Sequence, residues 1–365
     1  MTADSTDLSL LLRPELAELA AYLPDSGSYR VRLDANEAPP LLSAPARARL
    51  AEVAADTAWE RYPDARSAAL RAAIARKVGV GPDEILAGVG SDEVITFLLT
   101  ALARPRSGSR GPTIVTTTPT FVMYRLSAKS RGVNVVEVPL DSSWDLAESS
   151  LLHALEISPP NLVFIATPNN PTGNRMSPDR LARVIEAARG ALVVVDEAYV
   201  DYAEGDHLEL YRRHENVALL RTLSKVGFAA LRVGWLVARP ELVREIDKVR
   251  SPYNLPSVSQ ALATSVLEEL GAEIQQACAT VRAERARLTS ELGRLAGVEV
   301  TPSEANFLWV RTEKPAADVF EGLCARGVLV RSFHARGGRL RHQLRVTVGT
   351  AEENTLFLAA LAEAL

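Results

Sequence analysis

The sequence predicts an α/β fold, with a large domain that has a mostly parallel sheet flanked by helices and a smaller α+β domain. Four apolar runs, TIVTTT, LVFIAT, ALVVVD and VALLRT, lie between residues 113 and 222 and alternate with helical stretches. Continuous apolar runs are typical of parallel strands that are buried on both faces. Towards the C-terminus short strands mix with two helices, which indicates a second unit.

We expect the chain to divide into three parts. Residues 1–38 form an N-terminal arm that joins the small domain, residues 39–275 form the large domain, and residues 276–365 form the small C-terminal domain. A long helix over 274–295 leads out of the large domain.

Local patterns predict the remaining elements in order. Apolar residues at helical spacing predict helices over 10–22 and 64–78. The segment ILAGVGSDEVITFLLTALA predicts a strand, a glycine-rich turn and a helix that begins near Ser91. The later helices and strands are expected over 240–250, 258–270, 306–310, 328–331 and 343–348.

Composition narrows the classes of function. The 365 residues include 24% charged residues and carry a formal net charge of -4, which argues against nucleic acid as the main partner. The two cysteines lie outside any CxxC pattern and no histidine has metal-ligand spacing, so we expect reduced thiols, a cytoplasmic location and no metal. We expect neither a signal peptide nor a membrane span. Small molecules are therefore the predicted ligands.

Three polar clusters, NNPTG, DEAY and SK, follow predicted strands. In open parallel sheets, ligands bind beyond the carboxyl ends of the strands. Asp196 follows four apolar residues, so its carboxylate needs a partner, either a pyridinium nitrogen or a nearby Arg or Lys. Tyr199 and Asn170 are suited to bind a phenolic oxygen of a ligand, although a core-edge tyrosine and a turn asparagine are equally ordinary interpretations.

The segment GVGSDE predicts an anion site. Gly88 and Gly90 permit a close backbone approach, and Ser91 begins a helix whose first amides can hold a phosphate. A dinucleotide-binding loop would need GxGxxG, but Glu93 occupies the third glycine position. Alternatively, Asp92 and Glu93 only favour the positive end of a helix dipole.

Lys225 lies between apolar runs in RTLSKVGFAALRVGW. A lysine in a dry site can act as a nucleophile or bond to a carbonyl compound. Thr222 and Ser224 supply hydroxyls and Arg232 supplies a guanidinium, and these groups suit a phosphate. The segment GVGSDE and the three polar clusters NNPTG, DEAY and SK, taken in order, each suit one part of the same cofactor.

These motifs resemble the aspartate-aminotransferase-like group of pyridoxal-phosphate enzymes (fold type I), and within it the histidinol-phosphate aminotransferases. The likeness covers nearly the whole chain, in which LDANEAPP, RYPD, GVGSDE, PTFVMYR, PNNPTG, VVVDEAY, RTLSK, LRVGW and LRVTVGT stand in the family's order. The resemblance implies a homodimeric enzyme with pyridoxal 5'-phosphate as its cofactor.

The resemblance also implies roles around the cofactor. Lys225 would bond covalently to it and later move a proton between substrate and cofactor. Asp196 would pair with the pyridine nitrogen, and Tyr199 and Asn170 would bind the phenolate oxygen. Phe121 would stack on the ring. The groups that would hold the cofactor phosphate are the backbone of Ser91 and Asp92, the side chains of Thr222, Ser224 and Arg232, and Tyr62 of the other subunit.

By the same likeness, Tyr22, Asn36, Arg331 and Arg345 would bind substrate. Arg345 matches the arginine that takes the α-carboxylate of the amino donor in relatives, and an arginine pair also suits the phosphate of histidinol phosphate. The alternative is that Arg331 and Arg345 belong to a solvated basic face, ARGGRLRHQLR.

One departure from the family lies after Lys225. Many relatives have eight positions from this lysine to the phosphate-binding arginine, whereas SKVGFAALR has seven. We expect a shortened turn that still delivers Arg232 to the phosphate.

The resemblance predicts an aminotransferase of histidine biosynthesis that interconverts histidinol phosphate and 2-oxoglutarate with imidazole-acetol phosphate and glutamate. An aromatic amino acid aminotransferase and a threonine-phosphate decarboxylase share all the cofactor residues and stay open as alternatives. Retention of Lys225 argues against a non-catalytic ligand-binding relative, and the missing third glycine argues against a nicotinamide dehydrogenase.

Overall fold

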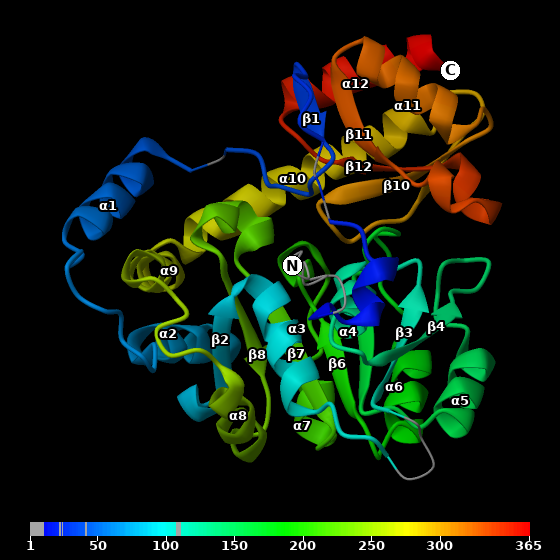
Figure 1. Ribbon diagram of the computed structural model, residues 1–365. Coiled ribbons are helices and arrows are strands. Elements are labelled where there is room, and N and C mark those ends of the chain that lie inside the picture. The colour runs from blue at the N-terminus through cyan, green and yellow to red at the C-terminus, as the bar shows by residue number, and fades with distance from the viewer. Residues whose placement is uncertain (1–10, 22, 24, 41, 107–110) are drawn as a thin grey trace, which may run out of the picture.

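Two lobes, each built on its own β-sheet, make up the computed structural model, which describes residues 11–21, 23, 25–40, 42–106 and 111–365 (Figure 1). The lower lobe in that view holds a seven-stranded sheet of order β2-β8-β7-β6-β5-β3-β4. Five strands, from β4 to β7 in space, are parallel, and only β8 runs antiparallel to its neighbours. The predicted mostly parallel sheet is confirmed. Its strands are β2 (Ile85–Val89), β3 (Thr113–Thr118), β4 (Asn134–Pro139), β5 (Leu162–Ala166), β6 (Leu192–Asp196), β7 (Val217–Thr222) and β8 (Val233–Val237).

Helices cover both faces of this sheet because its strands are apolar on both sides. Along β5, Val163 and Ile165 join one buried cluster, while Leu162 and Phe164 join a second cluster on the opposite face. The second cluster includes residues of α3 (Gly90–Ala101), α4 (Met123–Lys129) and α8 (Pro240–Ile246). The other helices of this lobe are α1 (Ala44–Ala55), α2 (Ala68–Val78), α5 (Glu148–Ile157), α6 (Pro178–Ala187), α7 (Leu208–Arg213) and α9 (Ser257–Glu269).

The upper lobe holds a five-stranded sheet of order β1-β11-β12-β10-β9. Its first strand comes from the N-terminal part of the chain and pairs in parallel with β11, while the other pairs are antiparallel. Helix α10 (Gly271–Leu292) runs from the lower lobe to the upper one (Figure 1). The remaining elements are β1 (Val31–Leu33), β9 (Val298–Thr301), β10 (Phe307–Thr312), β11 (Val328–Ser332), β12 (Gln343–Thr347), α11 (Ala316–Ala325) and α12 (Ala351–Ala364). Within the described ranges, no helix is both long and apolar enough to span a bilayer.

The sequence-based prediction was wrong at several helix boundaries. Instead of a helix over 10–22, the described part of this segment contains the 3-10 helix η2 (Pro14–Glu18), whose one leucine, Leu16, is 40% exposed. A short helix without a packed face has little to stabilise it. Helix α2 begins at residue 68 rather than 64, because Ser67 has a left-handed φ of 48° and the Asp64 carboxylate accepts from the Ala68 amide at 2.6 Å. Helix α10 is shifted three residues towards the N-terminus, from the expected 274–295 to 271–292.

Trp144 joins the two lobes. It lies in the loop after β4, and its ring meets the Trp309 ring of β10 edge-on, with 5.7 Å between centroids. The Arg339 guanidinium lies 3.8 Å from the Trp144 ring centroid and donates to the Leu140 carbonyl at 2.7 Å. Arg339 belongs to η9 (Gly338–His342) in the upper lobe, so cation–π and hydrogen-bond contacts tie that lobe to the lower one.

We expect Trp309→Ala to destabilise the protein severely, because Trp309 is fully buried and its ring fills the contact with Trp144. Truncating a buried tryptophan costs about 3–5 kcal/mol. Urea unfolding of the variant should show a clearly lower midpoint. Ile157→Ala is the matched control, since Ile157 is 67% exposed and its loss should change stability by less than about 0.5 kcal/mol. Equal midpoints for the two variants would contradict this account of the core.

Candidate active site

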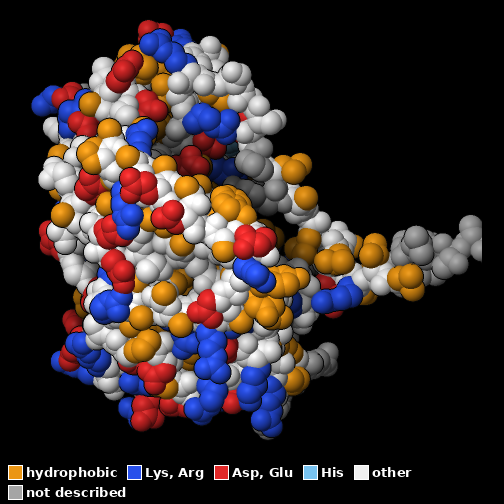
Figure 2. Space-filling view, turned by 90° about the vertical axis from the view of Figure 1, so that its left-hand side faces the viewer, with side chains coloured by type: hydrophobic (Ala, Val, Ile, Leu, Met, Phe, Trp, Pro, Cys, Tyr) orange, Lys and Arg blue, Asp and Glu red, His pale blue; other side chains and the backbone are white. Residues whose placement is uncertain are grey.

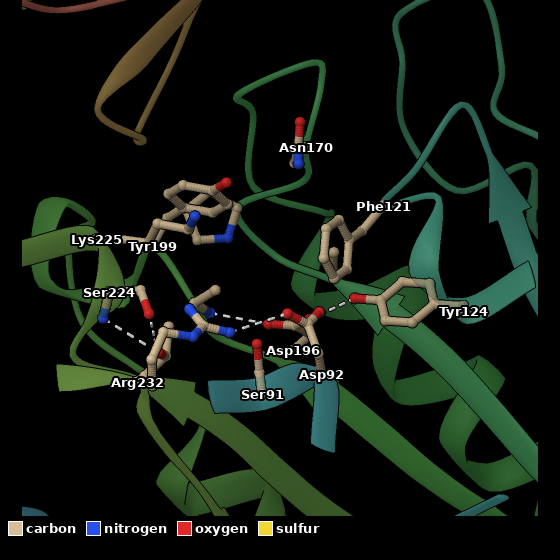
Figure 3. A pocket seen from close by; sticks show the side chains of 14 residues that line it. Ser91, Asp92, Phe121, Tyr124, Asn170, Asp196, Tyr199, Ser224, Lys225 and Arg232 are labelled. Atoms are coloured by element: carbon tan, nitrogen blue, oxygen red, sulfur yellow. Dashed lines mark hydrogen bonds and ion pairs between the residues drawn. The ribbon is translucent and has the colours of Figure 1, made fainter. Parts of the chain in front are cut away.

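A cavity of about 500 Å³ lies beyond the carboxyl ends of the central parallel strands. Its walls come from strand ends β5, β6 and β7, from the start of α3 and from the loop before α4. Figure 3 shows the side chains of Asp196, Lys225, Ser91 and Arg232 converging on this space. The three polar clusters of the sequence therefore meet in one cavity, as expected for the switch region of a parallel sheet.

Asp196 places a buried carboxylate at the floor of the cavity. It is the last residue of β6 and only 4% exposed. Its two oxygens accept hydrogen bonds from the Tyr124 hydroxyl at 2.5 Å and the Ala198 amide at 2.9 Å. No Arg or Lys forms an ion pair with it among the described residues, so the ordinary ion-pair interpretation is wrong. Burial raises the pKa of Asp196 to about 6, which makes the carboxylate a strong attractor for a cation.

Tyr124 is a site residue that the sequence analysis missed. It is fully buried, stacks on Phe164 with 4.8 Å between ring centroids, and meets Phe121 edge-on at 5.6 Å. Burial and the neighbouring Asp196 carboxylate raise the pKa of the Tyr124 phenol well above its usual value, so the phenol stays a donor. Its place three residues after Phe121 in PTFVMY, on the first turn of α4, was the available signal.

The predicted anion site forms where α3 begins. The first amides of a helix lack partners within the helix, and here Thr222, Ser224 and Arg232 stand beside them in the cavity wall. The Thr222 hydroxyl oxygen lies 2.9 Å from the Ser224 hydroxyl oxygen. The Arg232 guanidinium lies 3.4 Å from the Asp92 carboxylate, a long contact that leaves it able to bind an anion.

Two glycines make this arrangement possible. A Cβ at Gly234 of β8 would lie 2.4 Å from the Ser91 amide nitrogen, and a Cβ at Gly90 would lie 2.7 Å from the Arg232 guanidinium. Gly90 also has a φ of 73°, which favours glycine. The start of α3 can therefore approach β8 and Arg232 closely. Together they form an anion cup, which is lined by Ser91, Asp92, Thr222, Ser224 and Arg232.

Lys225 enters the cavity from a tight turn, η5 (Ser224–Phe228), in which Gly227 has a φ of 101°. The Tyr202 hydroxyl donates to the Lys225 carbonyl at 2.6 Å and so fixes the backbone of this turn. Among the described residues the Lys225 ammonium has no hydrogen bond or ion pair, and it lies 5.8 Å from the Tyr199 ring centroid. The short loop after it returns Arg232 to the same cavity, with a left-handed φ of 54° at Arg232.

Tyr199 is tied to the N-terminal segment. The Asn36 side-chain amide donates to the Tyr199 hydroxyl at 2.9 Å, and the Tyr199 ring meets Phe307 edge-on at 5.0 Å. Asn36 is itself held by its backbone amide, which donates to the Thr347 hydroxyl at 3.0 Å. Thr347 ends β12 of the upper lobe, and Asn36 follows β1 of the same lobe. The position of the Tyr199 phenol therefore depends on both lobes.

A second cavity of about 1230 Å³ opens from the first and shares Lys225, Tyr199 and Asn170 with it. Arg345 lies in its wall, is only 8% exposed, and donates to the Asn170 side-chain oxygen at 2.7 Å and to the Asp34 carbonyl. The solvated-face interpretation of Arg345 is therefore wrong. Arg331 lines the same cavity and is more exposed than Arg345.

One predicted site residue, Tyr62, lines neither of the two cavities. Tyr62 is 82% exposed and stacks on Tyr253, with 4.8 Å between ring centroids. It is absent from the walls of both cavities, as a residue that serves another subunit would be. Tyr22 lies outside the described residues.

The residues present fit pyridoxal phosphate. The unpaired amine of Lys225 suits the aldehyde, and the buried Asp196 carboxylate without a cation suits the pyridine nitrogen. The cup at Ser91 and Arg232 suits the phosphate. One oxygen of Asp92 is buried without a partner, which marks the cup as polar and unsatisfied by the protein alone.

We expect Asp196→Asn to stabilise the cofactor-free protein at neutral pH. The pKa of Asp196 rises from 3.8 to about 6 on folding, so the folded state holds the extra proton, and stability is lost as the pH rises from about 4 to 6. The asparagine variant carries no charge, and its side-chain oxygen can still accept from the Ala198 amide, so it should be more stable than the parent at pH 7 by roughly 3 kcal/mol. Unfolding of both proteins at pH 4 and pH 7 tests this, and a pH-independent difference would contradict it.

Comparisons with known proteins agree with this geometry. Residues 29–361 match the family model for aminotransferase class I and II. Histidinol-phosphate aminotransferase of Methylibium petroleiphilum is 40% identical, over 97% of this chain and 94% of its own length, and that of Chromobacterium violaceum is 40% identical, over 96% and 97%. The crystal structure of histidinol-phosphate aminotransferase from Sinorhizobium meliloti in complex with pyridoxal-5'-phosphate has the same fold, with a TM-score of 0.86 at 24% identity over 97% of each chain. The chain therefore belongs to the class I and II aminotransferases, within their histidinol-phosphate aminotransferase family, and is a pyridoxal-phosphate-dependent transaminase.

Proposed function

We propose that this transaminase moves an amino group between histidinol phosphate and 2-oxoglutarate, giving imidazole-acetol phosphate and glutamate. The observation that carries the proposal is Arg345, a nearly buried guanidinium held by Asn170 where the two cavities join. A fixed arginine beside the reactive lysine suits substrates with an anionic group close to the amine. Relatives named histidinol-phosphate aminotransferase, at 40% identity, support the choice of substrate.

The chain's own residues would divide the work as follows. The cofactor supplies an electron sink for the pair released at the substrate α-carbon. Lys225 would hold the cofactor covalently and would then take and return the proton at that carbon. Asp196, which accepts a hydrogen bond from Tyr124, would keep a proton on the pyridine nitrogen. Phe121 would lie against the ring.

The remaining residues would bind the phenolate oxygen and the phosphate of the cofactor. Tyr199, held by Asn36, and Asn170 would bind the phenolate oxygen, while the cup of Ser91, Asp92, Thr222, Ser224 and Arg232 would hold the phosphate. Arg345 would take the α-carboxylate of glutamate. Asn36, Arg331 and Tyr22 would contact the rest of the substrate.

The cofactor-loaded protein should lose its cofactor absorption band with histidinol phosphate far more efficiently than with phenylalanine. The expected cause is the phosphate, which phenylalanine lacks and which the arginines of the second cavity can bind more strongly than a single carboxylate. Stopped-flow absorbance at several concentrations of each amino donor gives the second-order rate constant of the conversion. Lys225→Ala is the control, since it keeps the cavity but removes the proton carrier, and its conversion should fall by several orders of magnitude.

Three outcomes would change the proposal. Preference for phenylalanine would make the protein an aromatic amino acid aminotransferase. Release of carbon dioxide from threonine phosphate, without amino transfer, would make it the decarboxylase. Full activity of Lys225→Ala would remove the lysine from the reaction altogether.

A homodimer is part of the proposal, with Tyr62 reaching the cofactor phosphate of the partner. Trp59, Tyr62 and Tyr253 are 74%, 82% and 45% exposed, which is unusual for large aromatic side chains. Figure 2 views the molecule from the left-hand side of Figure 1 and shows hydrophobic side chains exposed in its middle and right-hand part. A second copy of this chain would cover such side chains.

Mixed dimers test the role of Tyr62. Tyr62→Ala and Lys225→Ala each damage every site of their own dimer. If Tyr62 acts across the interface, a one-to-one mixture after subunit exchange contains hybrid dimers with one intact site, and activity should return to about a quarter of the parent's. If Tyr62 serves its own subunit, no site is intact and mixing restores nothing.

We also propose the division into an arm at 1–38, a large domain at 39–275 and a small domain at 276–365. The two separate sheets and the long helix α10 between them support it. The pairing of β1 with β11 supports the assignment of the arm to the small domain. We propose a cytoplasmic location, which suits a biosynthetic enzyme whose two cysteines are free thiols.

A further inference from the structure

Arg336 is a cationic residue in the substrate cavity to which the proposed function assigns no role. The second cavity, of about 1230 Å³, is lined by Arg331, Arg336 and Arg345 from the upper lobe. Among the described residues, the Arg336 guanidinium has neither a hydrogen bond nor an ion pair, and it lies 5.8 Å from the centroid of the Phe333 ring. A cation kept in a cavity wall without a counter-ion is a candidate ligand for an anion.

The turn that carries Arg336 is anchored upstream. Arg336 ends the 3-10 helix η8 (His334–Arg336), and its amide donates to the Phe333 carbonyl at 3.1 Å. The Phe333 ring meets the buried Trp309 ring edge-on, with 4.9 Å between centroids. The start of the turn therefore packs on the core of the upper lobe.

The same turn is anchored downstream to the other lobe. Gly337 and Gly338 have φ values of 67° and 55°, and they turn the chain sharply after Arg336. Arg339 then binds the Leu140 carbonyl and the Trp144 ring of the lower lobe. Held at both ends, the turn keeps the backbone of Arg336 at the mouth of the cavity, so the backbone would lose little conformational entropy on binding.

The local charge is positive. Partial burial and the positive charges of Arg125 and Arg331 lower the pKa of Arg336 from its usual value. The nearest acid, Glu137, is engaged by Arg125 at 3.9 Å. An anion at the mouth of the cavity would relieve this repulsion between like charges.

The two amino substrates place their anions at different depths. In glutamate the α-carboxylate is bonded directly to the reacting carbon, within reach of Arg345, which touches Asn170 next to Lys225. In histidinol phosphate a CH₂–O spacer separates the phosphate from that carbon, so the anion lies two bonds farther out. A phosphate monoester also carries nearly twice the charge of a carboxylate at pH 7.

We propose that Arg336 adds a further contact to the phosphate of the phosphorylated amino substrate and thereby strengthens the preference of the enzyme for that substrate over amino acids. This inference rests on the proposed function, because it assumes that histidinol phosphate is a substrate. Arg345 remains the ligand of the carboxylate. Arg336 is thus a specificity residue that leaves the chemistry at Lys225 untouched.

Arg336→Gln tests the inference in the cofactor-loaded enzyme. Because a charge-assisted hydrogen bond to phosphate is lost, kcat/KM for histidinol phosphate should fall by about tenfold or more, mainly through KM, while kcat/KM for glutamate should stay within about twofold. Arg341→Gln is the matched control, since Arg341 is an exposed arginine of the same segment that lines neither cavity. It should leave both substrates unchanged. Inorganic phosphate, used as a competitor of glutamate, should inhibit the parent enzyme more strongly than Arg336→Gln.

The outcomes separate the two proposals. If the parent enzyme uses histidinol phosphate and Arg336→Gln keeps the same KM for it, the role of Arg336 is wrong and the proposed function stands. If both substrates lose efficiency equally in Arg336→Gln, Arg336 supports the fold of the cavity and does not select substrates. If the parent enzyme does not use histidinol phosphate, the proposed function itself fails.

Discussion

The buried carboxylate of Asp196 is the constraint on which the site depends. A charge at the end of β6 with no cation beside it is costly to the empty protein, and burial raises its pKa to about 6. Tyr124 and the Ala198 amide lower the cost without cancelling the charge. At neutral pH the buried carboxylate thus attracts a cation, and a pyridinium nitrogen is such a cation. The same buried carboxylate would therefore both bind the cofactor and keep its pyridine nitrogen protonated.

Backbone packing sets where the other end of the cofactor lies. Gly234 lets β8 approach the amide of Ser91, and this contact fixes the start of α3 relative to the strand ends that carry Asp196 and Thr222. A side chain at residue 234 would push the helix away and open the cup. The distance between the anion cup and the carboxylate is therefore determined by the sheet, which is the most rigid part of the lobe, and not by mobile loops.

The sequence was most informative where the signal is local. The apolar runs predicted the parallel strands, and the polar residue after each run predicted which strand ends meet, because parallel strands end at one edge of a sheet. The prediction of a helix over 10–22 was wrong, because periodicity describes a possible apolar face but does not show whether anything packs on it. Tyr124 was missed for a related reason: its partner Asp196 is 72 residues away, and only the tertiary fold brings the two together. The burial of Arg345 likewise depends on Asn170 and Asp34 in distant segments.

The division of the site between two lobes explains why the substrate groups are harder to assign than the cofactor groups. Asp196, Lys225 and the anion cup belong to one sheet and its helices, so one lobe carries most of the groups proposed to hold the cofactor. The arginines of the second cavity belong to the upper sheet and reach the cofactor only through contacts such as Arg345 to Asn170 and Arg339 to Leu140. Any change in the angle between the lobes moves the arginines relative to Lys225. Substrate choice would then depend on the contact between the lobes, whereas most of the proposed cofactor ligands belong to the large lobe. Sequence motifs report the cofactor ligands much better than the substrate groups.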